Sequence, residues 1–372
     1  VETPRFTLQL IDEALDKALA PVRATDLAVE DARRLRDAVA AIAKRNLDAA
    51  LDLKREISDP IARKIVDWAR LRAGYGEPAE YRDFIAANPT WPDLGLLQGR
   101  LEEALFTQGG TTAAIKSHFA TGQPRTGIGL AALASAHLAD GETDKARLLA
   151  KRAWRDETIP ATLEEGFLAR FKPLLDEADH KWRLDRLLMN ESRWAAERNQ
   201  TAAIVRRVIP LLSEPERRKA QARLAVMLRA ADARKQMDAL PADTGADWGL
   251  VLSRVQMLRR ADRNDEAQKL LLTAPLDAAS VVSPDDWWEE RRANAYDALE
   301  AGKAKLAYEL VRDGGPLSVN PLKEQTFLAG WLAMRQLKQL GPAEAHFTAF
   351  RNAADGPLSR AKADYWLGRL AD

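Results

Sequence analysis

The four histidines are the first residues to test for metal or acid–base chemistry. No two of them have the spacing of metal ligands, and no HExxH pattern occurs. We therefore interpret each as a surface or packing residue: His118, His137, His180 and His346. The chain has no cysteine, which excludes disulfides, thiolate metal sites and cysteine nucleophiles.

Other catalytic patterns are also missing. The loop-like residues 121–127 contain two glycines, but no strand precedes them and no GK[ST] follows, so they indicate a turn and not a phosphate loop. No GxSxG, Walker or dinucleotide fingerprint occurs, and the acidic residues are scattered along helix faces without marking a glycosidase pair. We predict no catalytic residue, no cofactor-binding residue and no metal site in this chain.

The ten tryptophans are the remaining side chains with a recognisable binding chemistry, because indole rings can stack on sugar rings. Most of them fall on the apolar stripes of expected helices. We predict that at least seven belong to the core.

Residues 286–312 show the element on which the chain is built. Trp287, Trp288, Ala295 and Leu299 follow the spacing of one helical face, and a second helical pattern begins at residue 304. Gly302 lies between them, where a helix favours a left-handed cap. Neither helix is apolar all round, so each stripe must be buried by a neighbour, which is typical of an α-solenoid.

The same break recurs along the chain. We predict further turns at residues 139–141, 198–200, 263–265 and 339–341, with 38 positions from Asn264 to Gly302 and 39 from Gly302 to Gly341. The sequence thus predicts an all-α solenoid of helical hairpins of the tetratricopeptide type. We expect a single superhelical domain over residues 1–372 with a soft seam near residues 241–245. A first amphipathic helix is expected from Leu8 to Leu19, stopped by Pro21.

Charge and hydropathy exclude two classes of protein. Lys and Arg total 56 against 55 Asp and Glu, a net charge of +1, which argues against a dedicated nucleic-acid binder. No apolar run reaches the roughly 18–20 residues that span a bilayer. The amino-terminal residues VETPRF lack a signal peptide's basic and apolar regions, so either the protein is cytosolic or a targeting segment was removed.

Several stretches resemble a known family. In order they are DPIARKIVDWARLR, RLLMNESRWAAERN, DDWWEERRANAYDALEAGKAKLAYELVRD, FLAGWLAMRQL with AEAHFTAF, and SRAKADYWLGRLAD. Together they resemble the superhelical N-terminal domain of soluble lytic murein transglycosylases, from about Asp59 to the end. The most specific are WWEERR (287–292), FLAGW (327–331) and YWLGR (365–369).

The resemblance implies a periplasmic protein whose helical superhelix forms a ring. In this family a linker domain and a lysozyme-like domain follow, and the latter cleaves the β-1,4 bond between N-acetylmuramic acid and N-acetylglucosamine to a 1,6-anhydro product. Its single catalytic glutamate lies in an ESxF motif, with a GLMQ-type stretch further on.

This chain departs from that pattern. Glu191-Ser192 is followed by Arg193-Trp194 instead of x-Phe, falls inside an expected repeat helix, and has no GLMQ-like run after it. We therefore reject Glu191 as a catalytic acid and expect this chain by itself to be inactive. It looks like the scaffold portion, without linker and catalytic domains, either as a truncation or as a protein that has lost them. The apolar stripe of the last expected helix, SRAKADYWLGRLAD, indicates that more chain follows in the parent protein.

Two functions follow from these interpretations. The first is a periplasmic, non-catalytic scaffold that encloses or orients murein glycan strands, with the parent protein's linker and catalytic domains and other cell-wall proteins as partners. The alternative is a tetratricopeptide-like adaptor that binds a peptide or helix. Generic hairpins fit both functions, whereas the family-like stretches fit only the first.

Overall fold

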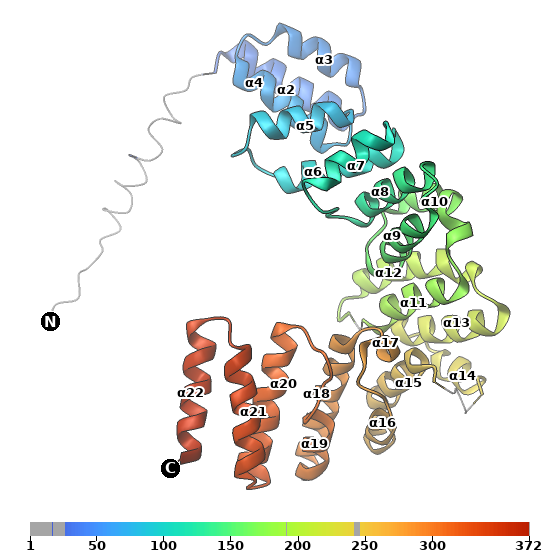
Figure 1. The fold of residues 1–372 in the computed structure, drawn as a ribbon, viewed down its shortest axis with the longest axis vertical. Coiled ribbons are helices and arrows are strands. Elements are labelled where there is room, and N and C mark those ends of the chain that lie inside the picture. The colour runs from blue at the N-terminus through green and yellow to red at the C-terminus, as the bar shows by residue number, and fades with distance from the viewer. Residues whose placement is uncertain (1–16, 18–26, 191, 242–245, 372) are drawn as a thin grey trace, which may run out of the picture. The chain divides into compact units, whose positions relative to one another are not determined.

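The computed structural model describes residues 17, 27–190, 192–241 and 246–371, and every regular element in this part of the chain is helical (Figure 1). The all-α prediction is confirmed. Apart from the helical Lys17, the predicted first helix from Leu8 to Leu19 lies outside the described residues, as does most of the predicted seam near 241–245.

The chain divides into two compact units. The first comprises residues 1–153 and 157–159, and the second residues 154–156 and 160–372. The prediction that residues 1–372 form one superhelical domain stays a prediction. In the first unit α2 pairs with α3 and α4, α5 pairs with α6, and α8 packs on α6 and α7. Its helices are α2 (Val29–Ala43), α3 (Leu47–Glu56), α4 (Pro60–Arg72), α5 (Pro78–Ala87), α6 (Leu94–Thr107), α7 (Thr112–Ala120), α8 (Gly127–Ala139) and most of α9 (Thr143–Asp156).

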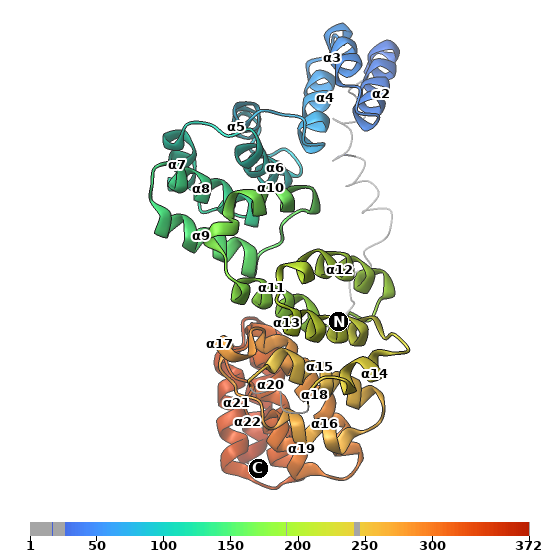
Figure 2. The ribbon, with the colours of Figure 1, turned by 90° about the vertical axis from the view of Figure 1, so that its right-hand side faces the viewer.

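The second unit is a longer run of hairpins. Its helices after the end of α9 are α10 (Ala161–Phe171), η1 (Lys172–Leu174), α11 (Glu177–Met189), α12 (Ala195–Val208), η2 (Ile209–Leu211), α13 (Glu214–Leu228), α14 (Ala233–Asp238), α15 (Trp248–Arg260), α16 (Asn264–Leu271), α17 (Ala278–Val281), α18 (Pro284–Glu300), α19 (Ala304–Val311), α20 (Val319–Trp331), η3 (Leu332–Gln336), α21 (Leu340–Ala353) and α22 (Pro357–Ala371). Hairpins α15–α16, α18–α19 and α20–α21 follow one another, and α22 packs on α21. Helices α18 to α22 stay in one bundle in both views (Figure 1; Figure 2).

One turn geometry joins many of these helices. Gly302 adopts a left-handed φ of 74°, and the next N–H, of Lys303, donates to the Ala298 carbonyl at 2.8 Å. Asp262, with φ 55°, makes the same turn between α15 and α16. This is the Schellman cap, in which a left-handed residue lets the chain reverse while the last helical carbonyls stay bonded. It recurs at Arg45, Gly74, Gly141 and Arg229.

The predicted turns are only partly correct. Those at 139–141 and at Gly302 are confirmed, whereas residues 198–200 lie inside the continuous helix α12. Near 263–265 the left-handed residue is Asp262, and near 339–341 it is Lys338, so Gly341 already belongs to α21. Asn and Gly raise the probability of a turn, but a helix tolerates them when its neighbours stabilise it.

The placement of Ser192 also corrects a prediction. The stretch around Glu191-Ser192 was expected inside a helix, but α11 ends at Met189 and α12 begins at Ala195. The Ser192 hydroxyl accepts a hydrogen bond from the Trp194 N–H at 3.1 Å, a local turn that competes with the helical bond. Glu191 itself lies outside the described residues.

Most tryptophans are less buried than predicted. Only Trp154, Trp287 and Trp288 are buried, and the last two belong to one core cluster of the second unit. Trp194 is 67% exposed. The prediction of at least seven core tryptophans is wrong, because a hairpin in a row has neighbours on only some of its sides and leaves other rings partly accessible. The half-buried ones are Trp68, Trp91, Trp182, Trp248, Trp331 and Trp366.

Carboxylates on one helix cap the start of a later helix at several positions. The buried Glu102 on α6 accepts from the Arg125 and Thr126 N–H groups at 2.8 and 2.9 Å, just before α8. Asp285 on α18 likewise accepts from the Ser318 N–H at 3.0 Å, at the start of α20. A carboxylate is favourable there because it satisfies free N–H groups at the positive end of the helix dipole. Asp31 and Glu177 make the corresponding bonds to residues before α4 and α13.

The shared turn geometry predicts opposite effects of two substitutions in the second unit. Gly302→Ala should lower the free energy of unfolding by about 1 kcal/mol, because the new Cβ meets nothing within 4 Å and only the left-handed φ is penalised. Asp262→Gly should leave the stability unchanged or raise it by up to about 1 kcal/mol. Urea unfolding of both variants beside the wild type measures the difference, and destabilisation of equal size in both would contradict this account of the turn.

Candidate binding groove

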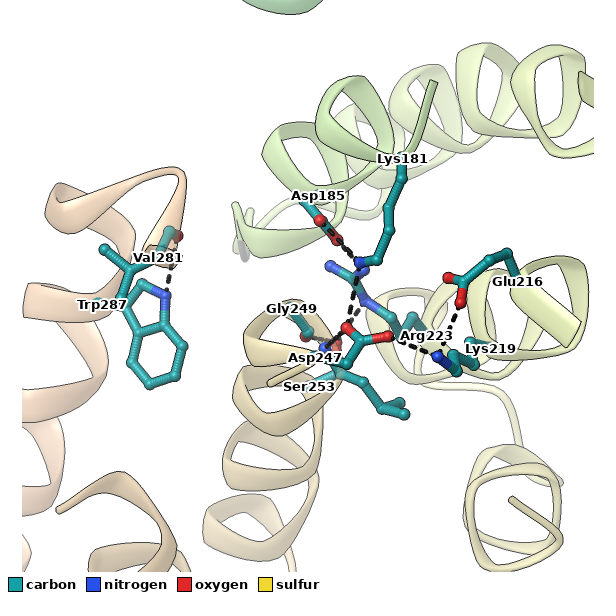
Figure 3. A network of polar contacts seen from close by, with 11 residues as sticks. Lys181, Asp185, Glu216, Lys219, Arg223, Asp247, Gly249, Ser253, Val281 and Trp287 are labelled. Carbon is teal, nitrogen blue, oxygen red and sulfur yellow. Dashed lines mark hydrogen bonds and ion pairs between the residues drawn. The ribbon is translucent and has the colours of Figure 1, made fainter. Parts of the chain in front are cut away.

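A charged cluster joins α11, α13 and α15 in the second unit (Figure 3). Arg223 and Asp185, both buried, form an ion pair, and Arg223 Nε donates to the Ser253 hydroxyl at 3.2 Å. Gly249 makes room for the pair, because a Cβ there would lie 2.3 Å from Asp185 Oδ1. The close approach of α15 to α11 and α13 therefore requires glycine at this position.

Asp247 completes this cluster at the start of α15. It caps the helix by accepting from the Leu250 N–H at 3.1 Å, and it pairs with Lys181 Nζ at 3.1 Å and Lys219 Nζ at 3.0 Å. Burial would raise the pKa of Asp247, but the charges of Lys181 and Arg223 and the bond from Lys219 outweigh it and lower the pKa to about 2. Every carboxylate in the cluster has a cationic partner. We therefore interpret the cluster as a structural contact that holds α11, α13 and α15 together.

A groove of about 820 Å³ runs along α18, α20 and α22 in the same unit. Its volume is in the range of pockets that hold small ligands. Apolar and aromatic side chains dominate its walls, together with three cations and one carboxylate. The lining residues are Arg292, Tyr296, Leu299, Lys323, Glu324, Phe327, Leu328, Trp331, Phe350, Leu358, Ser359, Lys362 and Trp366.

The aromatic wall is a single cluster of rings. Phe327 on α20 lies with its centroid 5.8 Å from Trp366 and 5.7 Å from Phe350, and Trp366 stacks on the buried Phe347 at 5.7 Å. Gly330 allows α20 and α21 to approach, since a Cβ there would lie 2.7 Å from the Phe347 ring. The buried rings hold the half-buried ones in place, so the groove presents aromatic faces of fixed orientation.

Lys362 is the cation of the groove that is free to meet a ligand. Its Nζ lies 3.3 Å from the centroid of Phe327, and no carboxylate of the described residues forms an ion pair with it. Burial lowers the pKa of Lys362. By contrast, Lys323 pairs with Asp355 at 2.8 Å, and Arg292 pairs with Glu324. The groove therefore combines aromatic faces with one uncompensated positive charge.

The three most specific family-like stretches meet in this groove. WWEERR supplies Arg292 from α18, FLAGW supplies Phe327 and Trp331 from α20, and YWLGR supplies Trp366 from α22. The sequence identified these stretches as family-like but did not show that they share a surface. It also did not identify Lys362 as a residue of the groove. Its position four residues before Trp366, on the same helical face, was the available signal.

The histidines do not gather at this or any other described site. They lie on α7, α8, α11 and α21, and His137 bonds to Glu142 while His346 bonds to the Tyr308 hydroxyl. In residues 27–190, 192–241 and 246–371, no three His, Asp or Glu side chains form a group that could hold a metal ion. None of the helices that the structure describes is both long and apolar enough to cross a bilayer.

The chain has a match among solved structures at low sequence identity. No protein-family model and no curated protein matches the chain. The chain is similar to the 70-kDa soluble lytic transglycosylase solved in complex with bulgecin A, with 14% sequence identity and a TM-score of 0.43. The similarity covers 93% of this chain and 54% of that one, so this chain spans about half its length.

Because the pKa of Asp247 is low, we predict that Asp247→Asn lowers the free energy of unfolding by an amount that depends on pH. A carboxyl whose native pKa lies near 2 and whose ordinary value is 3.8 stabilises the fold above pH 4, and that contribution disappears as the pH falls toward 2. At pH 7 the variant should lose about 2 kcal/mol of unfolding free energy. Urea titrations at pH 7, 5, 4 and 3 should show a constant deficit down to pH 5 that narrows below pH 4.

Asp265→Asn is the matched control for that measurement. Asp265 is 79% exposed and pairs with Lys303 at the surface, and such pairs contribute little. The free energy of unfolding of Asp265→Asn should equal that of the wild type at every pH. A deficit in Asp247→Asn that persists unchanged at pH 3 would refute the assigned pKa.

Proposed function

We propose that this chain is a non-catalytic helical scaffold of a peptidoglycan lytic transglycosylase, and that its groove along α18, α20 and α22 contacts murein glycan strands. The observation that carries the proposal is the convergence of WWEERR, FLAGW and YWLGR on one groove. These stretches contribute Arg292, Phe327, Leu328, Trp331 and Trp366 to the groove wall, whereas Trp287 and Trp288 of WWEERR are buried in the core.

The chemistry of the groove suits such a polymer. Pyranose rings have apolar C–H faces, which pack on the half-buried Phe327, Trp331 and Trp366. Murein also carries carboxylates, on lactyl groups or stem peptides, and Lys362 offers an ammonium group without a carboxylate partner among the described residues. The polar groups Ser359 and Glu324 at the wall can bond to sugar hydroxyls.

The scaffold role assigns the bond cleavage to another part of the parent protein. The stretch at Glu191-Ser192 lacks the ESxF pattern, and no GLMQ-type run is present. Under this proposal, linker and lysozyme-like catalytic domains of the same parent protein act on strands that the scaffold orients. The protein then works in the periplasm, where murein lies, after removal of a targeting segment.

A tetratricopeptide-like adaptor is the competing function, since an aromatic groove can also receive the apolar face of a helix. The two functions differ in how strongly ligand binding should depend on the positive charge of Lys362. A glycan strand with carboxylates needs the cation, whereas a helix bound through apolar side chains needs mainly the aromatic rings.

Co-sedimentation with purified murein sacculi tests the proposal. The wild-type chain should bind saturably, and Lys362→Glu should weaken binding roughly five- to ten-fold, which corresponds to about 1–1.4 kcal/mol. Tryptophan fluorescence with N-acetylglucosamine oligomers, which lack carboxylates, should show a much smaller effect of the same variant.

Lys305→Glu is the matched control, because Lys305 is exposed on α19 and does not line the groove. It should bind sacculi as the wild type does. If the wild-type chain fails to sediment with sacculi while it captures a defined peptide ligand in the groove, the adaptor function replaces the scaffold function.

A further inference from the structure

A second cavity, of about 680 Å³, lies away from the groove in the same unit. Its walls come from α18, from the ends of α16 and α19 with the segments that follow them, and from α21. It shares no lining residue with the groove. Polar and charged side chains make up much of its surface, which sets its chemistry apart from that of the aromatic groove.

Arg291 is the unusual residue of this cavity. The residue is 4% exposed, and among the described residues its side chain makes one hydrogen bond, from Nη2 to the Ala274 carbonyl at a long 3.5 Å. No carboxylate of the described residues lies within ion-pair distance of it. The buried Arg183 and Arg223 of the same unit, by contrast, pair with Glu164 and Asp185.

An isolated buried guanidinium is costly, because burial removes its hydration without supplying an opposite charge. Burial lowers the pKa of Arg291, and the charge of Asp313 opposes that effect from beyond ion-pair distance. Since Arg291 lines the cavity, an anion inside the cavity could supply the missing partner. Arg binds carboxylates with two parallel hydrogen bonds, which makes such a partner favourable.

Asp313, which also lines the cavity, supplies the opposite charge. Asp313 accepts a hydrogen bond from the Gly315 N–H at 2.9 Å and, in the described part of the chain, has no cation at ion-pair distance. The other two charged residues of the walls, Arg312 and Glu309, form an ion pair with each other at 3.0 Å. The cavity thus holds one guanidinium and one carboxylate that face it without being paired.

The remaining polar wall is neutral. The Tyr308 hydroxyl and His346 Nε2 lie 3.1 Å apart and are hydrogen-bonded. Burial lowers the pKa of His346 against the opposing charge of Asp313, which favours the neutral imidazole at pH 7. The charge pattern that a ligand meets is therefore set by Arg291 and Asp313.

We infer that this cavity binds a small amino-carboxylate, with the carboxylate of the ligand on Arg291 and its ammonium group on Asp313. A free amino acid and the two ends of a short peptide share this chemistry. The inference does not depend on the proposed function of the groove.

Isothermal titration of the full chain in a cacodylate buffer at pH 7 tests the inference with four probes: glycine, alanyl-alanine, N-acetyl-alanyl-alanine and alanyl-alanine amide. Glycine or alanyl-alanine, or both, should bind saturably at one site. The ratio of their affinities shows whether the site prefers a free amino acid or a peptide. Each blocked dipeptide lacks one of the two charges and should bind at least about ten-fold more weakly than alanyl-alanine if the peptide is the ligand. Absence of binding by both glycine and alanyl-alanine would overturn the inference, as would equal binding of the blocked forms.

Arg291→Met separates a binding role from a packing role. Methionine fills similar space without a charge, so the variant should keep or raise the melting temperature while it loses ligand binding. Lys269→Gln, an exposed change on α16 outside the cavity, should keep the wild-type affinity. If Arg291→Met binds the probe as the wild type does, the assigned site is wrong.

Discussion

A helical hairpin of this chain cannot bury its own apolar stripe, and the rest of the structure depends on that constraint. Helices α18 and α19 illustrate it. Trp287 and Trp288 on α18 are buried in a cluster that also contains Leu252 and Leu271 from the preceding hairpin and Leu328 from the following one. Because each hairpin is completed only by its neighbours, the stability of the unit is distributed along the row. A helix that lost its register would expose the stripes on both sides of it.

Polar contacts fix that register where apolar packing alone would allow sliding. Glu102 and Asp285 reach the first N–H groups of a later helix, and such bonds form only when the two helices have one relative position. The Asp185–Arg223 pair and Asp247 hold α11, α13 and α15 together, with Gly249 providing the space. Buried ion pairs contribute little net stability because desolvation offsets their attraction. These charges are paired only when α11, α13 and α15 hold the relative positions seen here.

The same row of hairpins creates both cavities. Helices α18, α20 and α22 leave half-buried rings along one surface, while the segments after α16 and α19 enclose the buried Arg291. The two cavities differ in chemistry because one is formed by helix faces rich in aromatic residues and the other by helix ends and connections, where polar backbone and charged side chains collect. Adjacent residues of one stretch, Arg291 and Arg292, take part in different cavities since they are about 100° apart around α18.

The sequence by itself determined the helical class, the hairpin unit and the left-handed cap at Gly302, because these follow from interactions between residues at most a few positions apart. It did not determine that Lys338 and Asp262 take left-handed conformations, or that α12 continues through residues 198–200, since neighbouring helices decide between local alternatives of nearly equal energy. Only the tertiary structure brought Arg292, Phe327 and Trp366 into one groove, left Lys362 without a carboxylate partner among the described residues, and buried Arg291. Burial and pairing arise from contacts between residues tens of positions apart, and a single sequence carries no local signal for them.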